Sequence, residues 1–147
     1  MIQLPKELAK KHLQTSCCKG DVLFWKNFPI GITGRDSFFV LMTGCIDNQF
    51  LCARTTRKTY HYVGPTAKRL AHDIILIKRG ETTIFPVDTV IDLTWMRRFT
   101  TEQLSKLLGS DIEKRGKLPD NIIKRVDVYV RAAVTISPRD IKLILGA

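Results

Sequence analysis

The chain has 147 residues, of which 44% are hydrophobic and 26% are charged. This composition is typical of one globular domain, and it disfavours a disordered chain. Lysine and arginine number 24 against 14 aspartates and glutamates, so the formal net charge is +10. A positive excess of this size favours polyanions as partners, although the alternative of a basic surface without a partner stays open.

The cysteines and the lack of long apolar segments indicate the cellular compartment in which we expect the protein. The four cysteines, at positions 17, 18, 45 and 52, contain no CxxC pair, so we expect neither a zinc site nor any other cofactor. Cys45 and Cys52 face each other if a hairpin joins their segments, but cysteine is also a common small buried residue. With no apolar leader and no apolar run of membrane-spanning length, we expect reduced thiols, a cytoplasmic protein and no membrane contact.

The first half of the chain predicts a helix followed by strands. A short helix is expected over residues 1–14, within an extension that ends at residue 19. Three short segments rich in apolar and aromatic residues then predict strands at 21–25, 38–42 and 50–53. The middle strand is apolar throughout, so we expect it to be buried on both faces. Asp47–Asn48 predicts a turn that makes the last two strands antiparallel.

The second half predicts further strands and then helices. After a polar insertion over 57–73, strands are expected at 74–77, 82–85 and 90–95, and Pro86 indicates that the middle one breaks or lies at an edge. Residues 99–147 are predicted to be helical, because Thr100 with Gln103 forms a capping box and Ser137–Pro138 starts a further helix.

Together these elements predict one α+β domain spanning residues 1–147. We expect a small antiparallel β-barrel over residues 20–98, with an N-terminal helix before it and C-terminal helices over residues 99–147.

Chemistry-bearing side chains are concentrated where the strand at 50–53 passes into a polar, basic segment. Cations, hydroxyls and an aromatic ring follow one another there, a combination suited to phosphates and stacked bases. The RNA-binding candidates are Arg54, Thr56, Arg57, Lys58 and Tyr60. The chain has no nucleophile elbow, no HExxH motif and no Walker sequence.

Arginine and hydroxyl groups suffice for RNA cleavage without a metal. The 2′-OH attacks the adjacent phosphorus, and a cation with a hydrogen-bond donor stabilises the pentacoordinate phosphorane. Arg35 and Thr55 form such a pair if their strands are neighbours. The alternative interpretation is that Arg35 is a cation at the end of a loop and Thr55 is a hydroxyl at the end of a strand.

Several segments resemble the MazF/PemK family of toxin endoribonucleases. Gly20–Trp25 is similar to the first strand of that family, and Leu51–Thr56 is similar to a strand that closes on a Thr-Thr pair. Asp88–Trp95 resembles an aspartate-led strand that precedes basic residues. Arg35 lies where the family has an arginine, after a glycine-containing loop and before an apolar strand. The resemblance runs from about Gly20 to Val130.

The resemblance implies an SH3-like barrel that forms a homodimer and cleaves single-stranded RNA without a metal, leaving a 2′,3′-cyclic phosphate. It implies a cognate antitoxin whose disordered segment covers the active groove. Arg35 would then stabilise the phosphate or act as acid and base, Thr55 would support the transition state, and Asp88 would act at the site. The chain departs from the family at Asp36, where proline is usual, and at Pro86, where some members have arginine.

Two other functions stay open at this point. The first is a non-catalytic module that holds RNA or DNA through the basic and aromatic segment from Arg54 to Tyr62. The second is a protein-interaction domain whose basic surface receives an acidic partner segment.

Overall fold

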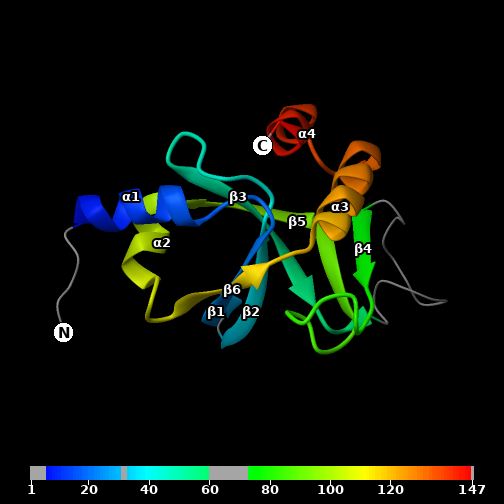
Figure 1. Ribbon diagram of the computed structural model, residues 1–147, viewed down its shortest axis with the longest axis horizontal. Coiled ribbons are helices and arrows are strands. Elements are labelled where there is room, and N and C mark those ends of the chain that lie inside the picture. Colours follow the sequence, from blue (N-terminus) through cyan, green and yellow to red (C-terminus); the bar gives the residue numbers. More distant parts are fainter. Residues whose placement is uncertain (1–5, 31–32, 60–72, 147) are drawn as a thin grey trace.

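The computed structural model describes residues 6–30, 33–59 and 73–146 (Figure 1). Within these ranges, four helices and six strands confirm the α+β class, and they follow in this order: α1 (Lys6–Ser16), β1 (Asp21–Ile30), β2 (Thr33–Leu41), β3 (Gln49–Thr56), β4 (Ile74–Ile77), β5 (Thr89–Thr100), α2 (Thr101–Leu107), β6 (Ile112–Lys117), α3 (Asp120–Ala132) and α4 (Pro138–Leu145).

The strands form a single antiparallel sheet in the order β4-β5-β3-β2-β1-β6. Within the described ranges, β4 and β6 are the two edges and do not pair with each other. The sheet is therefore open, and the predicted closed barrel is not confirmed.

Helices cover both faces of this sheet. Leu13 of α1 and Leu104 of α2 join one apolar cluster, while α3 and α4 contribute to the other, and the two helix pairs lie apart in Figure 1. We call the two sides the α1–α2 face and the α3–α4 face. Strand alternation sends Phe39 to the α1–α2 face and Val40 to the α3–α4 face. The predicted two-sided burial of this strand is confirmed for Phe39–Met42, whose side chains are at most 1% exposed.

Local signals at turns and helix starts are also confirmed. Asp47 and Asn48 both have positive φ, 51° and 60°, as a two-residue hairpin turn requires. The Thr100 hydroxyl accepts a hydrogen bond from the Gln103 amide at 3.0 Å at the start of α2, and Ser137 caps α4 in the same way.

The prediction that residues 99–147 are purely helical is wrong, because β6 lies among them and pairs with β1. Only Ile112 of this strand is buried, and four of its six residues are exposed and charged. An edge strand needs a single pairing partner and tolerates charged side chains. Its sequence therefore lacks the apolar alternation by which strands are recognised.

The strand predicted over residues 82–85 is also wrong, because residues 78–88 form a loop. Both carboxylate oxygens of Glu81 accept hydrogen bonds from Arg125 of α3, at 3.0 and 3.2 Å. The Phe85 ring packs against Phe38, with 6.1 Å between centroids. These side-chain contacts hold the loop against the α3–α4 face. A strand at this place would instead have needed a neighbouring strand to pair with.

We predict that Phe39→Ala lowers the free energy of unfolding by about 3–5 kcal/mol, because it empties a fully buried site. The Phe39 ring lies among four other aromatic rings, with centroid separations from 4.9 to 6.1 Å. Urea denaturation measures the change. Val128→Ala is the control, since Val128 is 58% exposed and its truncation should cost less than about 1 kcal/mol. Equal losses in the two variants would contradict this view of the core.

We predict that the Glu81–Arg125 pair stabilises the fold at neutral pH and not in acid. The hydrogen bonds from Arg125 lower the pKa of Glu81 below its ordinary value of 4.5. A carboxylate with a lowered pKa stabilises the folded state above its unfolded-state pKa, and this contribution disappears as the pH falls through the folded-state pKa. Glu81→Gln should therefore be less stable than wild type in urea at pH 7, and this deficit should shrink as the pH falls through the acid range. Glu113→Gln is the control, because its exposed pair with Arg115, at 3.3 Å, should contribute little; a deficit for Glu81→Gln that is as large in acid as at pH 7 would contradict the prediction.

Candidate nucleic-acid interface

A tryptophan on β5 lies beside two arginines. The guanidinium carbon of Arg97 is 4.7 Å from the centroid of the Trp95 ring, and that of Arg54 is 5.9 Å away. Trp95 and Arg54 are half-buried, and Arg97 is exposed. Both distances are within the range in which a cation is attracted to the face of an aromatic ring. We call these three residues the Trp95 surface.

Strand geometry explains why these side chains meet. Trp95 and Arg97 are two positions apart on β5, so they point to the same side. Arg97 pairs with Cys52 and Arg54 pairs with Phe39. Cys52 and Phe39 belong to the α1–α2 cluster, so the arginines paired with them also lie on the α1–α2 face.

The β3–β5 pairing becomes irregular where Trp95 and Arg54 meet. Ala53 pairs with Met96, but the next residue, Arg54, pairs with Asp92, so residues 93–95 are extra on β5. The register that ends at Ala53–Met96 would itself set Trp95 opposite Arg54, and the bulge keeps the two side chains in contact. The Asp92 carboxylate accepts a hydrogen bond from the Thr94 amide at 2.9 Å and another from its hydroxyl, which holds the bulge in shape.

The Trp95 ring is supported from below by the aromatic core. Its centroid lies 5.5 Å from that of Phe39 and 6.0 Å from that of Phe28. Both of these rings are buried, at 0% and 4% exposure. Trp95 is thus a fixed platform, and little conformational freedom remains to be lost when a ligand stacks on it.

The two arginines of this surface have unused capacity for an anion. Among the described residues, neither forms an ion pair of 4.0 Å or less. The Nε atom of Arg54 is buried and has no hydrogen-bond partner.

Arg35 lies on the same face as the Trp95 surface. It pairs with Phe28 across β1 and β2, and the Phe28 side chain belongs to the α1–α2 cluster. Arg35 is exposed. The neighbouring residue Asp36 points the opposite way by strand alternation, so the α1–α2 face carries a third cation beyond Phe28.

Thr55 lies on the other face of the sheet. It pairs with Ile91, which belongs to the α3–α4 cluster. Thr55 is only 8% exposed, and its hydroxyl donates a hydrogen bond to the Phe38 carbonyl at 3.1 Å. The structure therefore does not bring Arg35 and Thr55 together, because the alternation of strand side chains sends them to opposite sides.

The other predicted site residues lie near the end of β3 or in the following loops. The Asp88 carboxylate accepts a hydrogen bond from the Arg79 amide at 2.7 Å, and the Thr56 hydroxyl accepts one from the Lys58 amide at 3.1 Å. Arg57 and Lys58 are exposed just beyond the strand. Tyr60 falls outside the described residues. Of the predicted RNA-binding residues that the structure describes, only Arg54 belongs to the Trp95 surface.

Two members of this surface, Trp95 and Arg97, were not predicted as site residues. The available signal was their spacing, since an aromatic residue and a cation two positions apart on a strand share a face. That spacing does not reveal which face is left open by the helices, which is why the sequence alone did not single them out.

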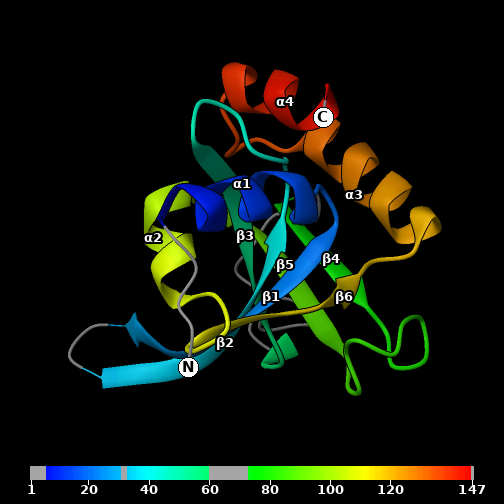
Figure 2. The same cartoon turned by 60° about the vertical axis from the view of Figure 1, so that its left-hand side comes forward.

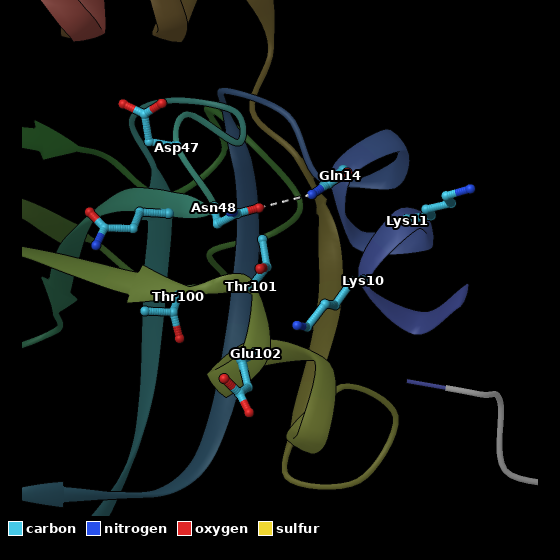
Figure 3. Close-up of a pocket in the computed structure, with 9 residues that line it drawn as sticks. Lys10, Lys11, Gln14, Asp47, Asn48, Thr100, Thr101 and Glu102 are labelled. Carbon is cyan, nitrogen blue, oxygen red and sulfur yellow. Dashed lines mark hydrogen bonds between the residues drawn. The ribbon is translucent and has the colours of Figure 1, made fainter. Parts of the chain in front are cut away.

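A separate polar groove of about 510 Å³ lies at the opposite end of β3 and β5 (Figure 3). Lysines of α1 line it together with two acidic residues, Asp47 and Glu102. One hydrogen bond crosses it, from the Gln14 amide nitrogen to the Asn48 side-chain oxygen at 3.4 Å. Because its lining mixes both signs of charge and has no aromatic ring, it suits a polyanion less well than the Trp95 surface does.

Comparison with protein-family models and with curated protein sequences gives no match. Within the part of the chain that the structure describes, no group of three or more His, Cys, Asp or Glu residues is placed to hold a metal ion. No described helix is both long and apolar enough to cross a membrane. The four cysteines are free thiols.

We predict that iodide quenches the fluorescence of Trp95 selectively. Trp95 is half-buried beside two arginines that attract the anion, whereas Trp25 is 6% exposed. Trp95→Phe should abolish most of the iodide quenching, and Trp25→Phe should retain it. Caesium, a cationic quencher, should be much less effective than iodide in wild type. Equal quenching by the two ions would show that the arginines do not shape the field around the ring.

Proposed function

We propose that this protein binds single-stranded RNA across the Trp95 surface. The observation that carries the proposal is the supported Trp95 ring flanked by the guanidinium groups of Arg54 and Arg97. Proteins that hold single strands combine aromatic rings, on which bases stack, with cations that follow the phosphates. A net charge of +10 adds long-range attraction for the same ligand.

A single strand fits this surface better than a duplex does. Stacking on a side chain requires a base with a free face, and bases in a duplex already stack on one another. One stacked base contributes about 1–3 kcal/mol. Arg54, Arg97 and Arg35 lie on the same face as the ring and offer contacts to successive phosphates.

RNA cleavage through Arg35, Thr55 and Asp88 stays a prediction. Binding on the Trp95 surface requires no rearrangement of the fold. The predicted catalytic pair, in contrast, would have to act from opposite faces of the sheet. We therefore place binding first and treat cleavage as a separate outcome of the same experiment.

The resemblance to the MazF/PemK family supports further proposals about architecture and partners. In an SH3-like barrel, the loop over residues 78–88 would take the place of direct pairing between β4 and β6; a Cβ atom on Gly116 of β6 would lie 3.3 Å from Ile84 of this loop. A homodimer, a cognate antitoxin and a cytoplasmic location are proposals on the same basis.

We predict that the protein binds a fluorescein-labelled 12-nucleotide RNA in EDTA, measured by anisotropy over a salt series. Trp95→Ala should weaken binding by about tenfold or more, from the loss of one stacked base. Arg54→Ala and Arg97→Ala should each reduce the slope of log K against log salt by about 0.7, the value for one phosphate contact in a single strand. Lys142→Ala, at an exposed position on α4, is the charge-matched control and should change binding little.

The same samples run on a denaturing gel separate the two functions. Intact RNA with salt-dependent binding supports the binding module. Cleavage that is lost in Arg35→Ala and in Thr55→Ala would support the endoribonuclease. Wild type that neither binds nor cleaves would overturn the proposal.

A further inference from the structure

We propose that Asp36 is a positioning residue of the RNA-binding face. Its carboxylate holds a β-bulge at the base of a projecting arm, and the arm carries Arg35 on the same face of the sheet as the Trp95 surface. This inference rests on the proposed function.

The arm is the part of the β1–β2 hairpin that extends beyond its neighbours. Strand β3 pairs with β2 only at Phe39–Leu41, and β6 pairs with β1 only as far as Trp25. Among the described residues, 26–30 and 33–36 thus form a two-stranded ribbon with no third strand paired to it. Figure 2 shows this ribbon projecting from the body of the protein. Because no described strand pairs along its sides, the direction of this ribbon depends on the residues where it joins the sheet.

The base of the arm is an irregular point in the β1–β2 pairing. The register shifts between Trp25 and Phe28, and Asn27 between them has a left-handed backbone, with φ of 53°. Such a bulge bends and twists the strand that carries it. The conformation at Asn27 therefore sets the angle at which the arm leaves the sheet.

Two contacts from β2 hold this conformation. The Asn27 amide donates a hydrogen bond to the Asp36 carboxylate at 3.0 Å. Gly34 allows the close approach of the two strands, because a Cβ atom there would lie 3.0 Å from the Asn27 carbonyl oxygen. Lys26, one residue earlier, is tied to the body of the protein by a hydrogen bond from its amide to the Asp111 carbonyl at 2.7 Å.

Asp36 does not neutralise the arginine beside it. Successive residues of a strand point to opposite faces, and no ion pair joins Arg35 to Asp36 among the described residues. The carboxylate acts on the bulge, while the guanidinium stays on the face that carries Trp95. Removal of the carboxylate would leave Arg35 charged but without a fixed position.

Two substitutions with the same change of charge test this role. Asp36→Asn keeps a side-chain oxygen that can accept from Asn27, whereas Asp36→Ala removes the acceptor. If Asp36 acted only through its charge, both variants would bind the 12-nucleotide RNA more tightly than wild type. We expect Asp36→Asn to bind at least as tightly as wild type. Asp36→Ala should bind about fivefold more weakly at 0.1 M salt, the effect of losing one phosphate contact.

A double-variant cycle links the effect to Arg35. Arg35→Ala should weaken binding by a similar factor and lower the salt slope by about 0.7. Arg35→Ala combined with Asp36→Ala should bind no more weakly than Arg35→Ala alone. Losses that multiply, or an Asp36→Ala protein that binds as well as Asp36→Asn, would overturn the inference. The proposed function would survive those results, provided that Trp95→Ala still weakens binding.

Amide exchange at Asn27 tests the bulge directly, without RNA. The Asn27 amide should be protected in wild type and in Asp36→Asn, and it should exchange faster in Asp36→Ala. Unprotected Asn27 in the wild-type protein would overturn the inference, whatever the binding data show. Thermal unfolding of each variant checks that the sheet itself stays intact.

Discussion

The fold depends on burying a single sheet on both faces. Phe39, Val40 and Leu41 are at most 1% exposed although they point alternately to opposite sides, which is possible only because one pair of helices covers each face. The helices do not extend over the whole α1–α2 face. Beyond the cover of α1 and α2, the aromatic core reaches the surface at Trp95, and arginines take the places that apolar side chains occupy elsewhere.

Irregularities in strand pairing lie beside the functional side chains. The extra residues 93–95 on β5 begin where Trp95 contacts Arg54, and the bulge at Asn27 sets the direction of the β1–β2 arm. The regular β3–β5 register up to Ala53–Met96 already directs Trp95, Arg97 and Arg54 to one side of the sheet. In both cases an aspartate holds the irregularity: Asp92 accepts from Thr94, and Asp36 accepts from Asn27.

Side-chain contacts take the place of strand pairing on the opposite face. The loop over residues 78–88 is fixed by the two hydrogen bonds from Arg125 to Glu81 and by the packing of Phe85 on Phe38. It covers apolar surface between the two edges of the sheet without adding a strand. Both apolar clusters are therefore covered, although the two edge strands of the sheet do not pair with each other. The expected barrel would have required that pairing.

The sequence by itself determined the α+β class, the buried strand that contains Phe39, the turn at Asp47–Asn48 and the helix caps, because each follows from local pattern and backbone chemistry. Tertiary structure alone decided which residues meet. Arg35 and Thr55 have compatible chemistry but lie on opposite faces of the sheet. A shift of one residue along a strand moves a side chain to the other face, and the register in which strands pair cannot be read from composition. Strand β6 and the group formed by Trp95, Arg54 and Arg97 likewise depend on long-range partners, whose positions the order of residues along the chain does not reveal.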